Sequence, residues 1–270
     1  MTHSFIYDGT WLGHTTYGVT VLGYSQHPAG ADVRRGEVEQ GGADGDVDFA
    51  RYLGSKHLTM ECVIAADSYA DYEAKLDRVR VLLDPREGLR LLVLDHQNHD
   101  LPESLRRGFY ARVDGPIYDT FYLNGGRFQL NWYIPSGKSA SLTTVTRTGI
   151  AISGTMYEPS GASDVVWGTD NALPVWTITA SGASTATVTL VNNTTLQTFR
   201  WTGTLATGDA LEIDSERQHC QKIVSGLYSN AMRYVTGSDP FPVLAAGYRN
   251  AIEVTGVTGT LGISYVPRFL

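Results

Sequence analysis

The second half of the chain is a succession of short segments in which apolar and polar residues alternate, separated by turn residues. These segments include VWTITAS at 175–181, ATVTLVNN at 186–193 and ALEID at 210–214. Alternation with a period of two over a few residues is typical of half-buried β-strands. Residues 137–270 contain no segment with the period of an amphipathic helix and no internal repeat. The spacing therefore predicts a β-sandwich of the jelly-roll type.

The first half also favours strands, but it includes one helical pattern. The segment DSYADYEAKLDRVRVLLDP predicts a helix over 68–83, with Ser68 as N-cap and Asp84-Pro85 as its end. Its apolar positions predict a buried stripe formed by Tyr69, Tyr72, Leu76, Val79 and Leu83. We expect this helix to lie across the open face of a sheet.

Other sequence patterns in the first half predict a strand, a hairpin turn and a domain boundary. Leu58, Met60, Cys62 and Ile64 alternate on one face of a predicted strand, and Asn124-Gly125-Gly126 predicts a hairpin turn. The segment PSGKSAS at 135–141 has the composition of a linker. The sequence thus predicts a mainly β protein with an N-terminal β-sandwich and one amphipathic helix at 1–136, and a C-terminal β-sandwich at 137–270.

Charge and cysteine content exclude several classes of protein. The net charge of −7 disfavours sequence-specific nucleic-acid binding, which depends on neutralising phosphates. The two cysteines, Cys62 and Cys220, are far apart and predict free thiols rather than a disulfide or a zinc ribbon. No basic, apolar leader or membrane-length apolar run is present, so we expect synthesis in a reducing cytoplasm and no membrane insertion.

The segment GTLATGDALEIDSERQHC at 203–220 has the composition of an active site. Asp214, Ser215 and His219 could form a catalytic triad, but no G-x-S-x-G motif surrounds the serine. Leu211 and Ile213 alternate with Glu212 and Asp214, which is typical of a strand with one wet face. The strand interpretation is favoured, and we expect the protein not to be an enzyme.

Two further segments resemble metal sites only in composition. DHQNHD at 95–100 offers Asp95, His96, His99 and Asp100, which could bind zinc, but a polar hairpin tip explains them better. The segment GGADGDVDF at 41–49 contains one copy of a glycine–aspartate pattern, whereas calcium sites of this kind need stacked copies. We therefore predict no metal and no cofactor.

The second half is rich in aromatic residues that could serve a binding face. Trp167, Trp176 and Trp201 are candidate sugar contacts, because an exposed indole can stack on a sugar ring. Core packing is the commoner role of tryptophan, and the alternation around Trp176 predicts that this side chain points inward.

The order of these features resembles that of a known family. A Phe-x-Tyr-Asp-Gly start and LGHTTYGV are followed by a Gly-Asp-Gly loop, one helix, LLDPREG and FQLNWYIP, and then by TGDALEIDSE and AAGYRNAIEVTG. This order resembles the distal tail proteins of bacteriophages with long, non-contractile tails, over nearly the whole chain.

The resemblance implies a structural protein of the virion, located at the tail tip and made in the host cytoplasm. It implies that the first domain forms a homohexameric ring and that the second domain is galectin-like. The ring would join the tail tube protein to the baseplate hub or tail-tip protein, beside the tape measure protein, and leave a channel for DNA. On this basis the predicted ring or axial contacts are Gly41, Gly42, Asp44, Gly45, Asp46, Asn124 and Gly125.

Two alternatives remain open at this stage. The second domain could bind a glycan on the host cell surface, with or without a scaffolding role. A hydrolase would require an activity that depends on Asp214 or His219.

Overall fold

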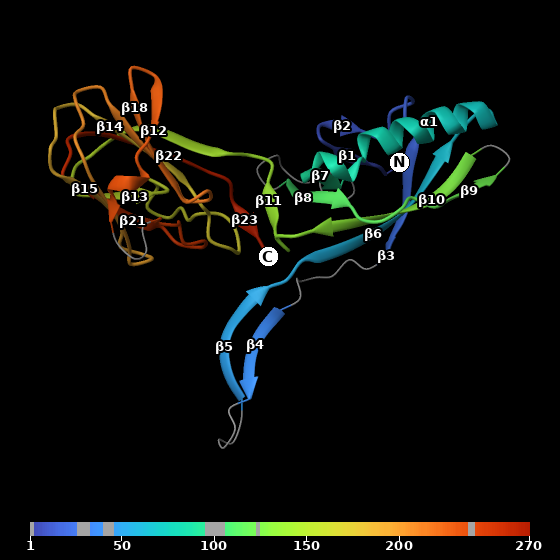
Figure 1. Ribbon diagram of the computed structural model, residues 1–270, viewed down its shortest axis with the longest axis horizontal. Helices are drawn as coiled ribbons and strands as arrows, with labels where there is room; N and C mark the ends of the chain where they lie inside the picture. Colours follow the sequence, from blue (N-terminus) through green and yellow to red (C-terminus); the bar gives the residue numbers. More distant parts are fainter. Residues whose placement is uncertain (1–2, 26–32, 40–45, 95–105, 123–124, 237–240) are drawn as a thin grey trace. The chain divides into compact units, whose positions relative to one another are not determined.

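The computed structural model describes residues 3–25, 33–39, 46–94, 106–122, 125–236 and 241–270. For residues 25, 33–39 and 46–53 only the backbone is described. The chain divides into two compact units, residues 1–142 with Leu270, and residues 143–269 (Figure 1). The sequence placed this change at residues 136 and 137. Both units are built mainly from antiparallel strands, which confirms the predicted fold class.

The first unit is an antiparallel sheet with one α-helix. Its main path runs β2-β1-β7-β8-β10-β6-β3, with β9 added beside β10 and β11 beside β8. The strand bounds are β1 Phe5–Tyr7, β2 Thr10–Trp11, β3 Val19–Ser25, β6 Lys56–Ala65, β7 Arg90–Leu94, β8 Arg107–Val113, β9 Asp119–Tyr122, β10 Gly125–Ile134 and β11 Ser139–Ser141.

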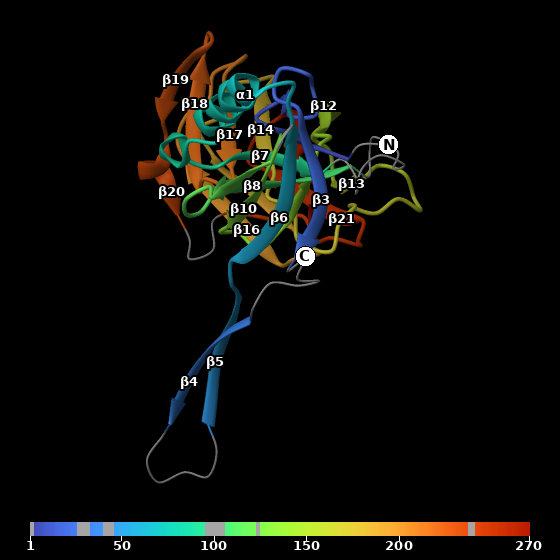
Figure 2. The ribbon, with the colours of Figure 1, turned by 90° about the vertical axis from the view of Figure 1, so that its right-hand side faces the viewer.

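A separate two-stranded sheet belongs to this part of the chain. Strands β4 (Val33–Glu39) and β5 (Asp46–Leu53) pair with each other, and β5 is followed closely by β6 (Figures 1 and 2). Among the described residues, neither strand pairs with any other.

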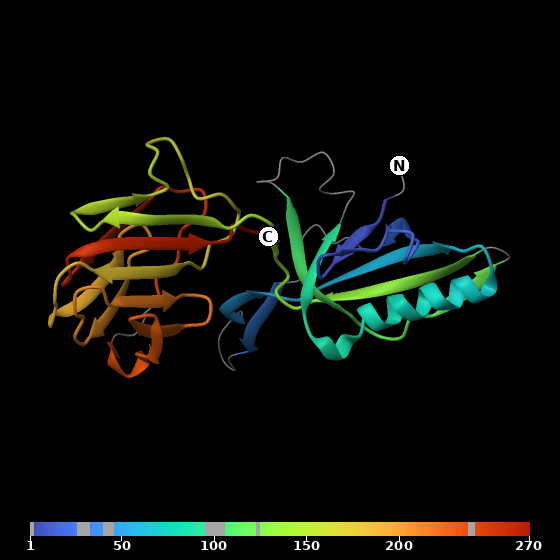
Figure 3. The same ribbon diagram turned by 90° about the horizontal axis from the view of Figure 1, so that it is seen from above.

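Helix α1 (Tyr69–Leu82) lies along β6 and β10 (Figure 3). The side chain of Ser68 accepts a hydrogen bond from the Asp71 N–H, which confirms the predicted N-cap. A short 3₁₀ helix, η1 (Pro85–Glu87), follows the C-cap at Leu83. The predicted stripe is buried at Tyr72, Leu76, Val79 and Leu83. Tyr69, the first residue of the helix, is the exception, since it is 58% exposed.

The core of the first unit contains the strand faces that the alternation predicted. Leu58, Met60, Cys62 and Ile64 of β6 are all buried. Trp132 of β10 is fully buried and packs edge-on against Phe5, with ring centroids 5.6 Å apart. Burial of large aromatic rings supplies much of the apolar area that stabilises a unit of this size.

The second unit is a sandwich of two antiparallel sheets. One sheet has the order β12-β22-β14-β17-β18-β19, and the other has the order β13-β21-β15-β16-β20. The strands of these sheets are β12 Val145–Ala151, β13 Thr155–Glu158, β14 Val175–Ala180, β15 Thr187–Asn192, β16 Gln197–Thr202, β17 Ala210–Asp214, β18 His219–Val224, β19 Leu227–Asn230, β20 Val235–Thr236, β21 Asn250–Thr255 and β22 Gly259–Tyr265. A final short strand, β23 (Arg268–Phe269), belongs to neither sheet. A 3₁₀ helix, η3, spans Met232–Tyr234.

The core of this sandwich holds the inward residues of both sheets. Trp176 and Ile178 from β14 are fully buried, as are Leu190 from β15 and Phe199 from β16. The inward direction predicted for Trp176 is therefore confirmed. No helix in the described residues is long and apolar enough to cross a membrane.

Candidate functional site

The segment that looked most like an active site is a structural corner of the sandwich. Ser215 is buried, and its hydroxyl donates a hydrogen bond to the Pro242 carbonyl at 2.8 Å while accepting one from Trp176 Nε1 at 3.2 Å. Asp214 Oδ1 accepts hydrogen bonds from the N–H groups of Glu216 and Arg217, both at 2.9 Å. The Ser215 hydroxyl therefore holds the core tryptophan, and the Asp214 carboxylate stabilises the turn that follows it.

The neighbouring acidic side chains also have local partners. Leu211 and Ile213 are buried, and Glu212 on the other face accepts a hydrogen bond from Gln221 at 2.5 Å. Lys222 Nζ lies 2.7 Å from Asp209 Oδ2. The hydrogen bond from Lys222, with a second from the Ala206 N–H, holds the pKa of Asp209 below its ordinary value. Both carboxylates therefore have a side-chain partner on β18.

The two thiols are remote from any solvent-accessible chemistry. Cys62 lies in the core of the first unit and Cys220 in that of the second. Burial raises the pKa of each thiol to about 12, so both stay protonated at neutral pH. A protonated, buried thiol is a poor nucleophile.

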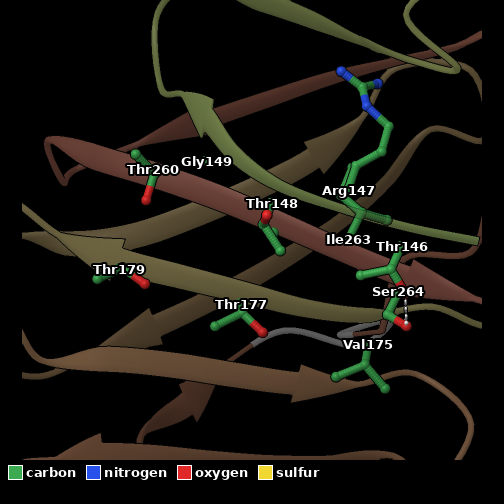
Figure 4. Close-up of a pocket in the computed structure, with 11 residues that line it drawn as sticks. Thr146, Arg147, Thr148, Gly149, Val175, Thr177, Thr179, Thr260, Ile263 and Ser264 are labelled. Carbon is green, nitrogen blue, oxygen red and sulfur yellow. Dashed lines mark hydrogen bonds between the residues drawn. The ribbon is translucent and has the colours of Figure 1, made fainter.

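A shallow groove crosses the outer face of β12, β22 and β14. Its volume is about 290 Å³, and Figure 4 shows the side chains that line it. Hydroxyl groups dominate the lining, and Thr146 Oγ1 lies 3.1 Å from Ser264 Oγ. The register of β12 shifts between Arg147 and Ile150. No histidine, aspartate or glutamate lines this part of the described surface, so the groove offers hydrogen bonds without an activating base.

Two strands of the first unit carry exposed apolar side chains. Strand β3 ends the main sheet path, but its Val19 and Val21 N–H groups donate hydrogen bonds to the carbonyls of Leu12 and His3, both at 2.9 Å. Strand β9 pairs only with β10 among the described strands. Leu22, at a register shift of β3, is 55% exposed. Phe121 and Tyr122 of β9 are 39% and 55% exposed. Edge strands present unpaired backbone groups that favour pairing with another chain.

An aromatic group continues this surface from β9 onto α1. Phe121 packs edge-on against Tyr69, with ring centroids 4.9 Å apart, and also contacts Tyr72 at 5.2 Å. The Tyr72 hydroxyl donates a hydrogen bond to Asp119 Oδ2 at 2.8 Å, which fixes β9 to the helix. Tyr118, just before β9, is 78% exposed. Exposed aromatic residues of this density are typical of protein interfaces.

The comparisons with known proteins agree for both halves of the chain. Residues 12–122 match the family model for the phage tail protein RIFT-related domain. Residues 167–269 match the model for the C-terminal domain of the siphovirus-type tail component. The chain belongs to the siphophage distal tail proteins. As a structural component of the phage tail or baseplate, this distal tail protein is associated with the virion.

Solved structures share its fold at low sequence identity. The crystal structure of SPP1 Dit (gp 19.1), described as a paradigm of the hub adsorption apparatus in phages that infect Gram-positive bacteria, has a TM-score of 0.76 and 14% identity, over 100% of both chains. The phage p2 baseplate in its activated conformation with Sr matches with a TM-score of 0.50 and 9% identity, over 97% of both chains. The p2 baseplate with Ca gives the same score and identity over 98% of both chains. No curated protein matches the sequence closely enough to count as a relative.

Several residues predicted as sites of the distal tail protein lie outside the described residues. These are the predicted contacts Gly41, Gly42, Asp44, Gly45 and Asn124, and the candidate metal ligands Asp95, His96, His99 and Asp100. Asp46 is the first residue of β5. Gly125 is buried and pairs with Ala65 of β6 and Tyr122 of β9. A Cβ at Gly125 would lie 2.4 Å from the Ile64 carbonyl oxygen, so this position is fixed by close packing within the chain.

The three candidate sugar contacts differ in their surroundings. Trp176 and Trp201 are 0% and 1% exposed, so core packing covers the ring faces on which a sugar would have to stack. Trp167 is 56% exposed. The sequence did not single out the exposed side chains Leu22 and Phe121. The aromatic residues of DTFY before the Asn-Gly-Gly turn were the signal that could have found Phe121.

Proposed function

We propose that this chain forms a homohexameric ring at the tail tip, which joins the tail tube protein to the baseplate hub or tail-tip protein. The ring leaves a central channel for DNA, beside the tape measure protein, and it performs no catalysis. The observation that carries this proposal is the exposure of apolar side chains on β3 and β9, namely Leu22, Phe121 and Tyr122, in a chain whose two halves both match phage tail families.

The two edges support a cyclic rather than a two-fold assembly. They lie on opposite sides of the strand series β9-β10-β6-β3. An edge of one copy can therefore meet the different edge of the next copy, which is a heterologous contact. Heterologous contacts close into a ring when the rotation between copies divides a full turn. The exposed apolar side chains on β3 and β9 would be covered in such a ring.

Symmetry and size of the purified protein test this proposal. Sedimentation velocity over a range of protein concentrations should show a large assembly in exchange with the monomer. Negative-stain images of the assembly should show a six-fold ring with a central opening. A chain that stays monomeric at all concentrations and also within the phage particle contradicts the proposal, as does turnover of a substrate that Asp214→Ala or His219→Ala abolishes.

A second function, binding of a host glycan by the second unit, is favoured by the exposure of Trp167. The Val166 N–H donates a hydrogen bond to the Tyr248 carbonyl at 3.0 Å, which holds the Trp167 segment beside Tyr248. Tyr248 is 63% exposed, and the Arg249 guanidinium lies 4.1 Å from the centre of the Tyr157 ring. Exposed aromatic rings with polar neighbours suit the stacking and hydrogen bonding that sugars need.

A glycan array tests this second function. Binding of the wild type that is lost in Trp167→Ala and retained in Tyr228→Ala would support it. Tyr228 is a suitable control because it is 65% exposed on β19 of the same unit. Absence of wild-type binding to any glycan would leave assembly as the role of this unit.

A further inference from the structure

A pocket lies beside η3, the short helix that connects the last strand of one sheet of the second unit, β19, to the last strand of the other, β20. Its volume is about 370 Å³, which is within the range of pockets that bind small molecules. We call it the η3 pocket. The lining residues that carry the argument are Trp201 of β16, Lys222 of β18, Ser229 and Asn230 of β19, and Arg233 and Tyr234 of η3.

The charged side chains that line the η3 pocket are both cationic. Lys222 and Arg233 contribute to its wall, and no aspartate or glutamate of the described residues does. Lys222 Nζ is held in place from outside the lining, because it lies 2.7 Å from the buried Asp209 and donates a hydrogen bond to the Thr204 carbonyl at 2.8 Å. The pocket is therefore positive in a chain whose net charge is −7.

Arg233 supplies the charge that is not compensated within this unit. Its guanidinium lies 4.6 Å from the centre of the Tyr234 ring and, in the part of the chain that the structure describes, has no acidic partner. A cation–π contact of this kind orients the guanidinium without neutralising it. The N–H groups of a guanidinium form a planar fork that matches a carboxylate or a phosphate.

Two neutral side chains of the lining have hydrogen-bond donors without acceptors. Asn230 Oδ1 accepts a hydrogen bond from the Met232 N–H at 2.9 Å, which leaves its amide NH₂ group to donate. Trp201 is buried, and its Nε1 has no hydrogen-bond partner among the described residues. By contrast, Nε1 of the equally buried Trp176 has two acceptors, each at 3.2 Å. A buried donor without an acceptor is costly, so an acceptor bound in the pocket would be stabilising.

We propose that the η3 pocket binds a small organic oxyanion, either a carboxylate or a phosphate monoester. Arg233, the Asn230 amide and the Trp201 N–H are the donors to the oxyanion, and Lys222 adds positive charge. The Ser229 hydroxyl donates to the Lys222 carbonyl at 3.1 Å, so its oxygen is available to accept from a hydroxyl of the organic part. This inference rests neither on the ring nor on glycan binding at Trp167.

Calorimetric titration of the full-length protein at low salt tests the pocket. Glucose 6-phosphate and glucuronate are the probes, which distinguish a phosphate from a carboxylate, and glucose is the neutral control. We expect the wild type to bind at least one of the two anions and not to bind glucose. A wild type that binds neither anion, or that binds glucose as tightly as the anions, overturns the proposal.

Two substitutions in the lining test which groups bind the anion. Arg233→Gln removes the charge, whereas Asn230→Asp keeps the acceptor for the Met232 N–H and replaces the free amide by a carboxylate. We expect each to weaken binding of the anion by about tenfold or more, because a hydrogen bond to a charged group is lost or replaced by repulsion. Variants that bind the anion as tightly as the wild type overturn the proposal.

Arg217→Gln is the matched control, because the Arg217 side chain is 84% exposed in the same unit and does not line the pocket. We expect it to bind the anion like the wild type. Binding as weak as that of Arg233→Gln would indicate a general effect of charge and overturn the proposal. Circular dichroism and sedimentation velocity should show the same fold and assembly for all variants, so this result is separate from that of the proposed ring.

Discussion

At the scale of single residues, the buried polar side chains of the second unit make hydrogen bonds that stabilise its turns and its core. Ser215 connects the indole of Trp176 to the Pro242 carbonyl, and Asp209 connects Lys222 to the Ala206 N–H. Both side chains are buried and hydrogen-bonded. A buried polar group with its partners in place is stabilising, whereas removal of one partner leaves the other unsatisfied.

The first prediction concerns the charge of Asp209. Its pKa is lowered in the folded protein, so its contribution to stability is present above the unfolded value of about 4 and is lost as the pH falls through the lower folded value. Asp209→Asn keeps an acceptor but removes the charge. We expect the variant to be less stable than the wild type at neutral pH, and the difference to shrink in acid. Urea unfolding of both proteins at neutral pH and in acid measures this difference in stability. A difference that is the same at both pH values would contradict the prediction.

The second prediction concerns the hydroxyl of Ser215. Ser215→Ala removes the acceptor of one Trp176 hydrogen bond, although the Pro242 carbonyl, 3.2 Å from Trp176 Nε1, remains. We expect a loss of about 1 kcal/mol in the free energy of unfolding, the usual contribution of such a bond. Chemical denaturation measures it. A stability equal to that of the wild type would show that the hydroxyl is not needed to hold the tryptophan.

At the scale of elements, helix α1 approaches the sheet most closely where Tyr72 meets a glycine. A Cβ at Gly126 of β10 would lie 2.3 Å from the Tyr72 ring, so the absence of a side chain there lets the helix approach. The same tyrosine holds Asp119 of β9 through its hydroxyl. One residue of the helix therefore positions both the helix and the strand at the open edge.

The third prediction follows from this contact. Gly126→Ala forces α1 away from β10, and we expect a loss of about 1–3 kcal/mol in the free energy of unfolding, as for other overpacked sites. Gly23→Ala on β3 is the matched control, because a Cβ there meets nothing within 4 Å. Thermal unfolding of both variants measures the effect. Equal melting temperatures would show that the helix can shift without cost.

Much of this element structure could be predicted from the sequence because it depends on local pattern. The alternation around Met60 and Leu211 and the cap at Ser68 are local signals, and the structure confirms them. The exposure of Tyr69 could not be predicted, because it depends on tertiary packing rather than on helical period. The position of β9 at the margin of the sheet depends on strand order, which periodicity does not encode.

At the scale of the whole molecule, the features of the first unit favour assembly with other copies. Leu22 of β3 and Phe121 and Tyr122 of β9 are exposed apolar side chains on the strands that end the series β9-β10-β6-β3. A stable monomer would normally protect such edges with charged residues. In the proposed ring, these side chains would be covered by the neighbouring copy.

The fourth prediction places a charge on one edge. Leu22→Lys should leave the fold intact, because Leu22 is 55% exposed, and should strongly reduce ring formation, because a lysine on an edge strand opposes pairing. Leu196→Lys is the matched control, since Leu196 is 85% exposed in the second unit. Sedimentation velocity compares the two variants with the wild type. Equal assembly of all three would exclude β3 from the ring contact.

The burial of both cysteines makes the wild-type chain a clean background for site-directed labelling. With Cys62 and Cys220 protonated and enclosed, a cysteine introduced at an edge position would be the accessible thiol for maleimide dyes. Pairs of such cysteines, one on β3 and one on β9, would form intermolecular cross-links wherever the two strands meet in neighbouring subunits. The number of bands in the resulting ladder on a non-reducing gel would then count the subunits directly.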